Sequence, residues 1–233
     1  MGEAATASGQ HPEWLVECHH LKTFTALSRF PVTRSAPVKF DPTARRPAWD
    51  KFISEVFPGD SEAIAWEIPA WLVTPDTSIQ KAILLLGEGA NGKSSYLRGL
   101  LAFIGKQNTS AVSLQKLEND RFSAARLIGR LANICPDLPG TDLAGTSVFK
   151  AITGGAPLMA EYKFRDSFEF IPYARLVFSA NHMPKSKDAS PAFFRRWLLV
   201  PFNATFVEGA PGTIPIVEPP APASPPHPRP ENA

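Results

Sequence analysis

Residues 82–104 read AILLLGEGANGKSSYLRGLLAFI. The run 82–86 is apolar throughout, as expected of a strand that is buried on both faces of a parallel sheet. It leads directly into residues 87–94, a full match to the phosphate-loop pattern GxxxxGK[ST]. Residues 94–104 then carry apolar side chains at helical spacing. A strand, a glycine-rich loop and an amphipathic helix in this order predict an α/β nucleotide-binding domain. The alternative is a glycine-rich turn without a ligand.

The loop has the chemistry that a triphosphate requires. Glycines let backbone N–H groups surround the phosphates, and the start of the following helix adds its positive end. We expect Lys93 to reach the β- and γ-phosphates of ATP and the Ser94 hydroxyl to bind Mg²⁺. The predicted ATP-binding residues are Gly87, Glu88, Gly89, Ala90, Asn91, Gly92, Lys93, Ser94 and Ser95.

Two further polar residues follow predicted strands. A phosphate-loop ATPase needs a carboxylate that holds Mg²⁺ or orients the attacking water. Asp137 follows the apolar strand 131–135 and is predicted to supply it, as a magnesium ligand beside Ser94. Asn181 follows the strand 175–179, where an amide suits contact with the γ-phosphate or the attacking water. The alternatives are an aspartate that caps a turn and an asparagine that ends a strand.

Arg195 and Arg196 lie between aromatic residues just before a predicted strand at 197–201. The planar guanidinium binds phosphate oxygens in a bidentate manner and keeps its charge at all working pH values. The pair therefore suits an arginine finger that is supplied to the γ-phosphate of a neighbouring subunit. The alternative is a solvated pair beside a buried strand.

The remaining pattern predicts a parallel sheet with helices on both faces. We divide the chain into a weakly structured segment (1–40), a small helical subdomain (41–80), the ATPase domain (81–206) and a proline-rich disordered tail (207–233). The tail holds nine prolines in residues 208–233, so it cannot form a core. Other expected elements are helices at 49–56, 61–73 (kinked or shortened by Pro69), 121–127 and 147–153, a strand at 111–114 and an antiparallel hairpin within 158–171.

Charge is unevenly distributed along the chain. Residues 81–206 contain 16 Lys and Arg against 9 Asp and Glu, a local balance of +7. A basic centre favours a polyanionic partner, although a solvated surface explains the charge equally well. Cys18-His19-His20 lacks the further ligands of a metal site. The sequence shows neither a secretory signal nor an apolar run long enough to cross a bilayer, so we expect a cytoplasmic protein without a membrane partner.

Five motifs in order resemble the superfamily 3 helicase domain of phage, plasmid and poxvirus-type primase–helicases. They are KAILLLGEGANGKSS (81–95), RLANICPDLP (130–139), FKAITGGAPLMAEYKFRDSFEF (149–170), RLVFSANHMP (175–184) and FFRRWLLVPF (193–202). The stretches FDPTARRPAWDKFISEVFPGD (40–60) and WLVTPDTS (71–78) also resemble the helical segment that precedes this domain. The resemblance covers about residues 40–206.

The resemblance implies an AAA+-like core, a homo-oligomeric ring that is usually hexameric, and ATP-driven movement on single-stranded or forked DNA. It implies that Lys93, Asp137 and Asn181 are catalytic, and that Arg196 is the trans-acting finger with Arg195 second. The segment 150–165 corresponds to the hairpin that enters the ring pore. Lys150, Lys163 and Arg165 are therefore the expected DNA-binding residues, although cations on a hairpin also suit a solvated edge.

The sequence departs from the family pattern at both ends. No primase domain precedes the motor, so a separate primase is a further expected partner. The family continues after Phe206 with helical and winged-helix sequence, whereas a proline-rich tail follows here. We therefore expect a truncated product of a phage, a plasmid or a bacterial host. Two alternatives stay open, a catalytically impaired remnant that binds nucleotide or DNA and a phosphate-loop kinase of small molecules.

Overall fold

The computed structural model describes residues 36–39, 41–57, 59, 61–74, 76–138 and 140–206. Most of the segment 1–40 and the whole tail 207–233 lie outside these residues, and so does Cys18-His19-His20. The expectations for those parts of the chain therefore stay predictions.

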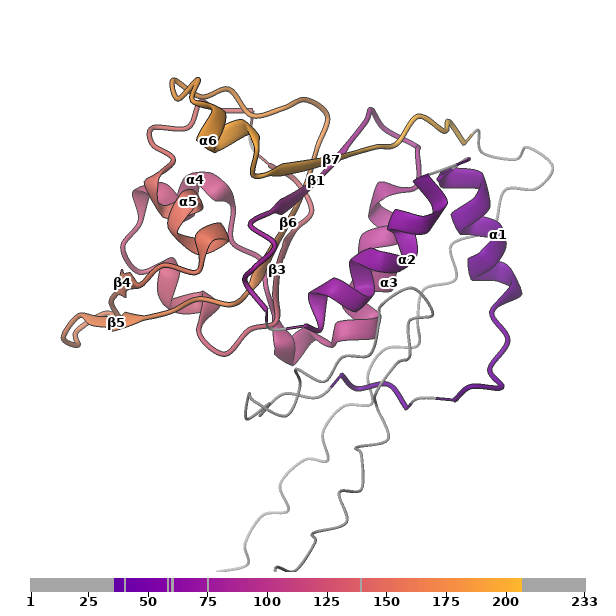
Figure 1. Cartoon of the computed structure of the whole chain (residues 1–233), viewed down its shortest axis with the longest axis horizontal. Coiled ribbons are helices and arrows are strands. Elements are labelled where there is room, and N and C mark those ends of the chain that lie inside the picture. The colour runs from indigo at the N-terminus through magenta and orange to yellow at the C-terminus, as the bar shows by residue number, and fades with distance from the viewer. Residues whose placement is uncertain are drawn as a thin grey trace, which may run out of the picture.

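Five parallel strands form the central sheet (Figure 1). In spatial order they are β2(Thr109–Ser110), β3(Ala132–Cys135), β6(Arg175–Ala180), β1(Ala82–Leu86) and β7(Trp197–Pro201). All four neighbouring pairs run parallel. The predicted parallel α/β architecture is confirmed, and it places the carboxyl ends of all five strands at one edge of the sheet.

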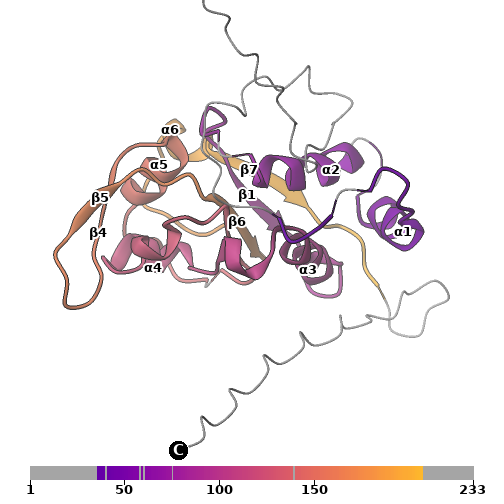
Figure 2. The same cartoon turned by 90° about the horizontal axis from the view of Figure 1, so that it is seen from below.

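Helices cover both faces of this sheet (Figures 1 and 2). One layer contains α1(Pro47–Val56), α2(Ser61–Leu72) and α3(Lys93–Ile104), and the other contains α4(Leu114–Asn119), α5(Ser147–Gly154) and α6(Pro191–Phe194). Alternate residues of β1 enter the two cores. Ile83 and Leu85 pack with the first layer, and Ala82 and Leu84 pack with the second. This double burial explains why the strand reads as an unbroken apolar run.

The helices α1 and α2 confirm the predicted helical N-terminal part, and they share the core of α3 and the sheet. The buried hydroxyl of Tyr96 in α3 donates a 2.8 Å hydrogen bond to the Ala65 carbonyl in α2. Pro69 lies inside α2, which continues to Leu72. Pro69 therefore does not end the helix.

The sequence prediction was wrong between β1 and β3. Instead of a strand at 111–114, the edge strand is Thr109–Ser110 and a helix begins at Leu114. Ser113 caps this helix by accepting a hydrogen bond from the Lys116 amide, which favours helix over strand. The helix expected at 121–127 shortens to a 3-10 helix, η3(Ala124–Leu127).

The antiparallel hairpin is confirmed as β4(Leu158–Ala160) and β5(Phe168–Phe170). Its inner face packs on η3 through a small apolar cluster that includes Ala124, Ala125 and Ala160. Both views show the hairpin extending away from the sheet beyond α4 and α5 (Figures 1 and 2). Among the described helices, none is both long and apolar enough to span a bilayer.

Candidate nucleotide-binding site

Three of the predicted sequence features meet at the carboxyl edge of the sheet. β6 lies between β1 and β3, so the segments that follow these strands are neighbours. The Gly87 amide donates a 3.3 Å hydrogen bond to the Ala180 carbonyl, and the Leu138 amide donates a 2.9 Å hydrogen bond to the Ser179 carbonyl. The phosphate loop, Asp137 and Asn181 therefore share one edge, with Asn181 at the end of the strand between the other two.

The backbone conformation of the phosphate loop explains why glycine occupies two of its positions. Gly92 has φ +90° at the start of α3, and a Cβ there would lie 2.9 Å from Val56 Cγ2. Gly87 has φ +152°, and a Cβ there would overlap the Phe202 carbonyl oxygen. Both positions therefore require glycine for conformation and for space. The tight path of the chain around the start of α3 depends on them.

Lys93 is 8% exposed, and its ammonium group contacts only uncharged oxygens of the loop. Nζ donates to the carbonyl of Gly87, to that of Glu88 at 2.7 Å and to Asn91 Oδ1 at 3.2 Å. Burial lowers the pKa of Lys93, and the nearby charge of Glu88 opposes this shift. Among the described residues, no carboxylate forms an ion pair with Lys93. A buried cation without an ion-pair partner fits an anionic ligand.

The amides of the loop offer a second feature that suits an anion. Within the described residues, no hydrogen bond occupies the amides of Gly89, Ala90 and Gly92. The loop opens α3, a helix of 12 residues with no side-chain cap, so the free amides at its start add a positive potential. Together with Lys93, these groups fit the phosphates of a nucleotide.

The residues present also fit a magnesium ion. Ser94 and Asp137 are exposed at the same edge of the sheet. The described part of the chain has no cluster of three His, Cys, Asp or Glu residues that would form a protein-only metal site. Mg²⁺ in phosphate-transfer sites is usually held by one or two protein oxygens together with substrate phosphates and water. Ser94 and Asp137 would supply the protein oxygens.

The two arginines lie at the opposite edge. β7 runs parallel to β1, and the Ala82 amide donates a 2.7 Å hydrogen bond to the Arg196 carbonyl. A strand of this length separates Arg196 from the phosphate loop by about 16 Å. The arginines therefore cannot complete the nucleotide site of their own chain, and a role at a phosphate requires the site of another subunit.

The two arginines differ in how freely their side chains can move. Arg196 is half-buried, and its Nη1 donates a 2.5 Å hydrogen bond to the Ala192 carbonyl. The buried Nε of Arg196 has no hydrogen-bond partner among the described residues. Burial lowers the pKa of the Arg196 guanidinium, and the nearby positive charge of Arg195 lowers it further by a smaller amount. Arg195 is exposed. Because its side chain is exposed, Arg195 is better placed than Arg196 to reach the nucleotide site of a neighbouring subunit.

The turn of the hairpin presents cations and an aromatic ring to solvent. Lys163 and Arg165 are exposed on either side of Phe164, which is 100% exposed and has φ +63°. Tyr162, which is 43% exposed, stacks on Phe168 with the ring centroids 5.2 Å apart. An exposed aromatic ring between two cations suits a strand of nucleic acid, which offers both phosphates and bases.

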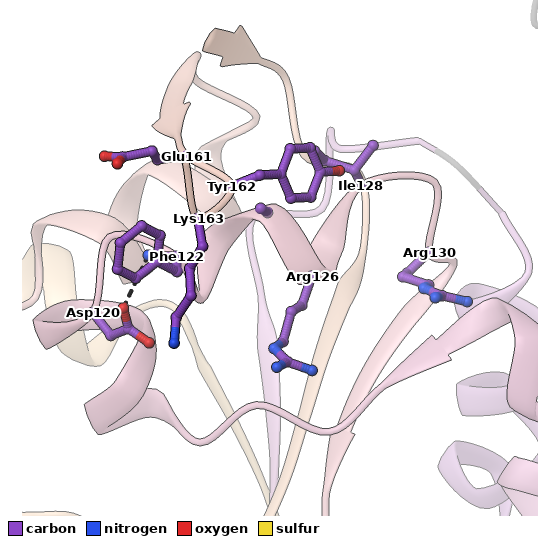
Figure 3. Close-up of a pocket in the computed structure, with 9 residues that line it drawn as sticks. Asp120, Phe122, Arg126, Ile128, Arg130, Glu161, Tyr162 and Lys163 are labelled. Carbon is purple, nitrogen blue, oxygen red and sulfur yellow. Dashed lines mark hydrogen bonds between the residues drawn. The ribbon is translucent and has the colours of Figure 1, made fainter. Parts of the chain in front are cut away.

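A pocket of about 560 Å³ lies between this turn and the segment that contains η3 (Figure 3). Lys163, Arg126 and Arg130 line it, and Figure 3 shows the charged ends of Lys163 and Arg126 on the same side of the pocket. The guanidinium of Arg130 also donates to the Gln107 carbonyl. Sequence reasoning did not single out Arg126 or Arg130, because they join Lys163 only when the hairpin packs on η3.

The third predicted DNA-binding residue, Lys150, has a different environment. It lies on α5, and its ammonium group forms an ion pair with Asp188 and contacts Ser190 Oγ at 3.4 Å. Thr146 donates to the same carboxylate. These hydrogen bonds hold the pKa of Asp188 well below its usual range, and the bond from Lys150 has the largest effect. Lys150 thus connects α5 to the loop after β6, whereas Lys163 and Arg165 lie in the hairpin turn.

Comparison with known proteins supports the fold. A model of a family of unknown function, DUF5906, matches residues 85–196. No curated protein matches the chain. The A form apo structure of the NrS-1 C-terminal region has a TM-score of 0.56 at 16% identity over 78% of this chain. A second apo structure of that region has a TM-score of 0.53 at 16% identity over 76% of this chain.

These matches establish a shared fold. They span 43% and 42% of the NrS-1 chains, so this chain corresponds to less than half of those structures. A structure of JCV helicase with a bound small molecule has a TM-score of 0.46 at 12% identity, over 69% of this chain and 46% of that one. That score is too low to support a conclusion. The protein is thus an α/β protein with a phosphate-loop motif at the carboxyl edge of a five-stranded parallel sheet.

Proposed function

We propose that this protein is an ATP-hydrolysing motor domain that acts on single-stranded or forked DNA. The observation that carries the proposal is the arrangement around Lys93. A buried ammonium group that forms no ion pair among the described residues lies in a glycine loop at the start of a helix, at the edge that Asp137 and Asn181 share. That arrangement suits the binding of a triphosphate and Mg²⁺.

Each group at this edge has one task in the proposed reaction. Lys93 and the loop amides bind and orient the phosphates. Ser94 and Asp137 hold the magnesium ion, which neutralises charge on the phosphates. Asn181 hydrogen-bonds the γ-phosphate or the attacking water. Catalysis of phosphoryl transfer consists largely of such positioning and charge stabilisation. One subunit therefore supplies every group that the proposed reaction needs, except a cation on the far side of the γ-phosphate.

The missing cation comes from a second copy of the chain. Arg195 and Arg196 lie too far from the phosphate loop of their own chain, and Arg195 is exposed. We therefore assign the finger to Arg195 in trans, with Arg196 packed behind it. This role requires a homo-oligomer, for which the hexameric ring implied by the sequence resemblance is the expected form.

DNA binding is assigned to the hairpin turn. The support is the exposed group formed by Lys163, Phe164 and Arg165, together with the cations of the adjacent pocket. Phosphate contacts of this kind are independent of base sequence, as a motor that moves along DNA requires. The resemblance further suggests a phage- or plasmid-type replication system in which a separate primase is a partner.

The decisive experiment measures ATP hydrolysis with and without single-stranded DNA for the wild-type protein and for Lys93→Ala and Ser94→Ala. We expect DNA-stimulated hydrolysis that both substitutions abolish. Ser94 is exposed, so its substitution leaves the fold intact even if the loss of buried Lys93 does not. The matched control is Lys106→Ala, which removes an exposed lysine just beyond the far end of α3 and should retain activity.

Titrations with nucleotide and with DNA, and the same hydrolysis assay with added small metabolites, separate the alternatives. Nucleotide or DNA binding without any turnover would identify a catalytically impaired binding module. ATP consumption that a small metabolite stimulates and DNA does not would identify a kinase. Absence of affinity of the folded protein for any nucleoside triphosphate would refute the motor, the kinase and a module that binds nucleotide.

A further inference from the structure

Asn91 differs from its neighbours in the phosphate loop because it is buried. It is 4% exposed, whereas Glu88, Gly89 and Ala90 are exposed. A buried carboxamide is costly unless its donors and acceptors are paired. The hydrogen-bond partners of the Asn91 side chain therefore indicate its role in the loop.

The two ends of the carboxamide contact different parts of the molecule. Nδ2 donates a 3.1 Å hydrogen bond to the Phe202 carbonyl, just beyond β7. Oδ1 accepts a 3.2 Å hydrogen bond from Lys93 Nζ. The side chain thus joins the phosphate loop to the segment after β7 and contacts the ammonium group that the proposed function assigns to the phosphates.

Backbone hydrogen bonds reinforce this connection. The Phe206 amide donates a 2.7 Å bond to the Ala90 carbonyl, and the Phe202 amide donates a 2.6 Å bond to the Leu86 carbonyl. Residues 202–206 therefore run alongside the phosphate loop from its beginning to its centre. We call this segment the loop support.

Gly87 provides the space that the Asn91 carboxamide needs to reach Phe202. A Cβ on Gly87 would overlap both Asn91 Nδ2 and the Phe202 carbonyl oxygen. The absence of a side chain at Gly87 thus allows the carboxamide to reach the loop support. An aspartate at position 91 would keep the acceptor for Lys93, but its carboxylate would place a second acceptor against the Phe202 carbonyl.

We propose that Asn91 is a positioning residue that fixes the phosphate loop against the loop support and holds the Lys93 ammonium group in the loop until phosphate replaces its carbonyl partners. The segment after β7 is then the second wall of the nucleotide site. This inference rests on the proposed nucleotide binding. It adds a residue whose role is to align the amides and Lys93 rather than to contact the phosphates.

The test compares Asn91→Ala and Asn91→Asp with the wild-type protein by calorimetric titration with Mg²⁺–ATP, alongside thermal unfolding of each protein. We expect Asn91→Ala to weaken ATP binding by about tenfold, because it removes the side-chain hydrogen bonds to Phe202 and Lys93 that orient the loop. Asn91→Asp should weaken it further, because its carboxylate repels the Phe202 carbonyl and the phosphates and competes for Lys93.

A matched control separates positioning from stability. Asn108 is also buried, and its Nδ2 donates a 2.8 Å hydrogen bond to the Ile104 carbonyl at the other end of α3. Asn108→Ala should lower the midpoint of thermal unfolding and leave the ATP dissociation constant of the folded protein unchanged. A purely structural Asn91 would behave in the same way, so an unchanged dissociation constant in Asn91→Ala overturns the proposal.

A second pair of variants tests the loop support without changing Asn91. Phe206→Pro removes the amide that bonds to Ala90, and Phe206→Ala removes the same ring but keeps the amide. We expect Phe206→Pro to bind ATP more weakly than Phe206→Ala. Equal affinities would overturn the role of the loop support. Failure of the wild-type protein to bind ATP would instead refute the proposed function.

Discussion

The backbone amide of Gly87 donates a 3.3 Å hydrogen bond to the carbonyl of Ala180. The first residue of the phosphate loop is therefore bonded to the residue that precedes Asn181, although 93 positions separate Gly87 from Ala180 in the sequence. This hydrogen bond holds the start of the phosphate loop against the end of β6. This relationship places Asn181 next to the phosphate loop, where its proposed role at the γ-phosphate can be tested.

Asn181→Ala should retain ATP binding within about threefold and reduce the turnover rate by about a hundredfold, the usual scale for the loss of one group that orients a reactant. The carboxamide is exposed at the strand end, so its removal does not disturb the core. Steady-state hydrolysis and nucleotide titration measure the two quantities. The adjacent exposed His182 provides the control, because His182→Ala should leave both unchanged. Equal effects of the two substitutions would remove Asn181 from the reaction.

Gly87→Ala should abolish nucleotide binding, whereas Gly89→Ala should be tolerated. A methyl group on Gly87 would meet Asn91 and the Phe202 carbonyl, and the φ of this residue strains any other side chain. Overpacking and backbone strain each cost about 1–3 kcal/mol at such a position. A Cβ on Gly89 meets nothing within 4 Å. Titration with ATP checks the pair, and normal binding by Gly87→Ala would show that the loop does not need the observed conformation.

Arg195→Ala should leave ATP affinity unchanged and reduce turnover of the assembled protein by about a thousandfold, the lower range for an arginine finger. A mixture of Arg195→Ala with Lys93→Ala should regain part of the activity that neither variant has alone. In the mixture, some interfaces join an intact phosphate loop to an intact finger from the other subunit. A mixture as inactive as its components would exclude action in trans.

Arg196→Ala should differ from Arg195→Ala by lowering stability as well as turnover. Its guanidinium bonds the Ala192 carbonyl and lies half-buried beside α6, so its removal loses both packing and a hydrogen bond. Thermal unfolding of the two variants compares them. A stability loss confined to Arg195→Ala would reverse the assignment of the finger.

Lys163→Ala should weaken binding to single-stranded DNA of any sequence and lower the slope of log K against log salt by about one. Arg126→Ala should have the same kind of effect if the strand passes through the pocket that both residues line. Lys187→Ala is the control, since this exposed lysine lies on the loop after β6. Binding isotherms at several salt concentrations give the slope, and a slope equal to that of the wild type would exclude a phosphate contact.

Asp188→Asn should lower stability at neutral pH by removing the ion pair with Lys150. The pKa of Asp188 is depressed in the folded protein, so its contribution is fully present above the usual carboxyl pKa of about 3.9 and declines as the pH falls below it. The difference in unfolding free energy between the wild type and Asp188→Asn should thus be constant from pH 7 to 5 and shrink below pH 4. Denaturant unfolding at several pH values measures it. A difference that grew on acidification would contradict the assignment.

Most of the fold was predictable because local patterns agreed with the final structure. The sequence pattern matches one kind of secondary structure in the apolar strands, in the helix after the phosphate loop and in the hairpin. The error between β1 and β3 has a local cause. Residues 111–114 are apolar enough for a strand, yet Ser113 caps a helix, and the sheet needs only Thr109 and Ser110 at its edge. The side chain of Asn133 instead bonds both the amide and the carbonyl of Val112.

The sequence alone determined the phosphate loop, because its glycines, lysine and serine act at fixed spacing along one short stretch of chain. It also determined the parallel α/β class, since strands buried on both faces read as largely apolar runs, of which β1 is the clearest. Only the tertiary structure decided which distant residues meet. The order of the strands brought Asn181 beside Gly87, and the parallel pairing of β7 with β1 set Arg195 at the opposite edge. The burial of Asn91 against Phe202 likewise depends on contacts between residues more than a hundred positions apart, which no local pattern encodes.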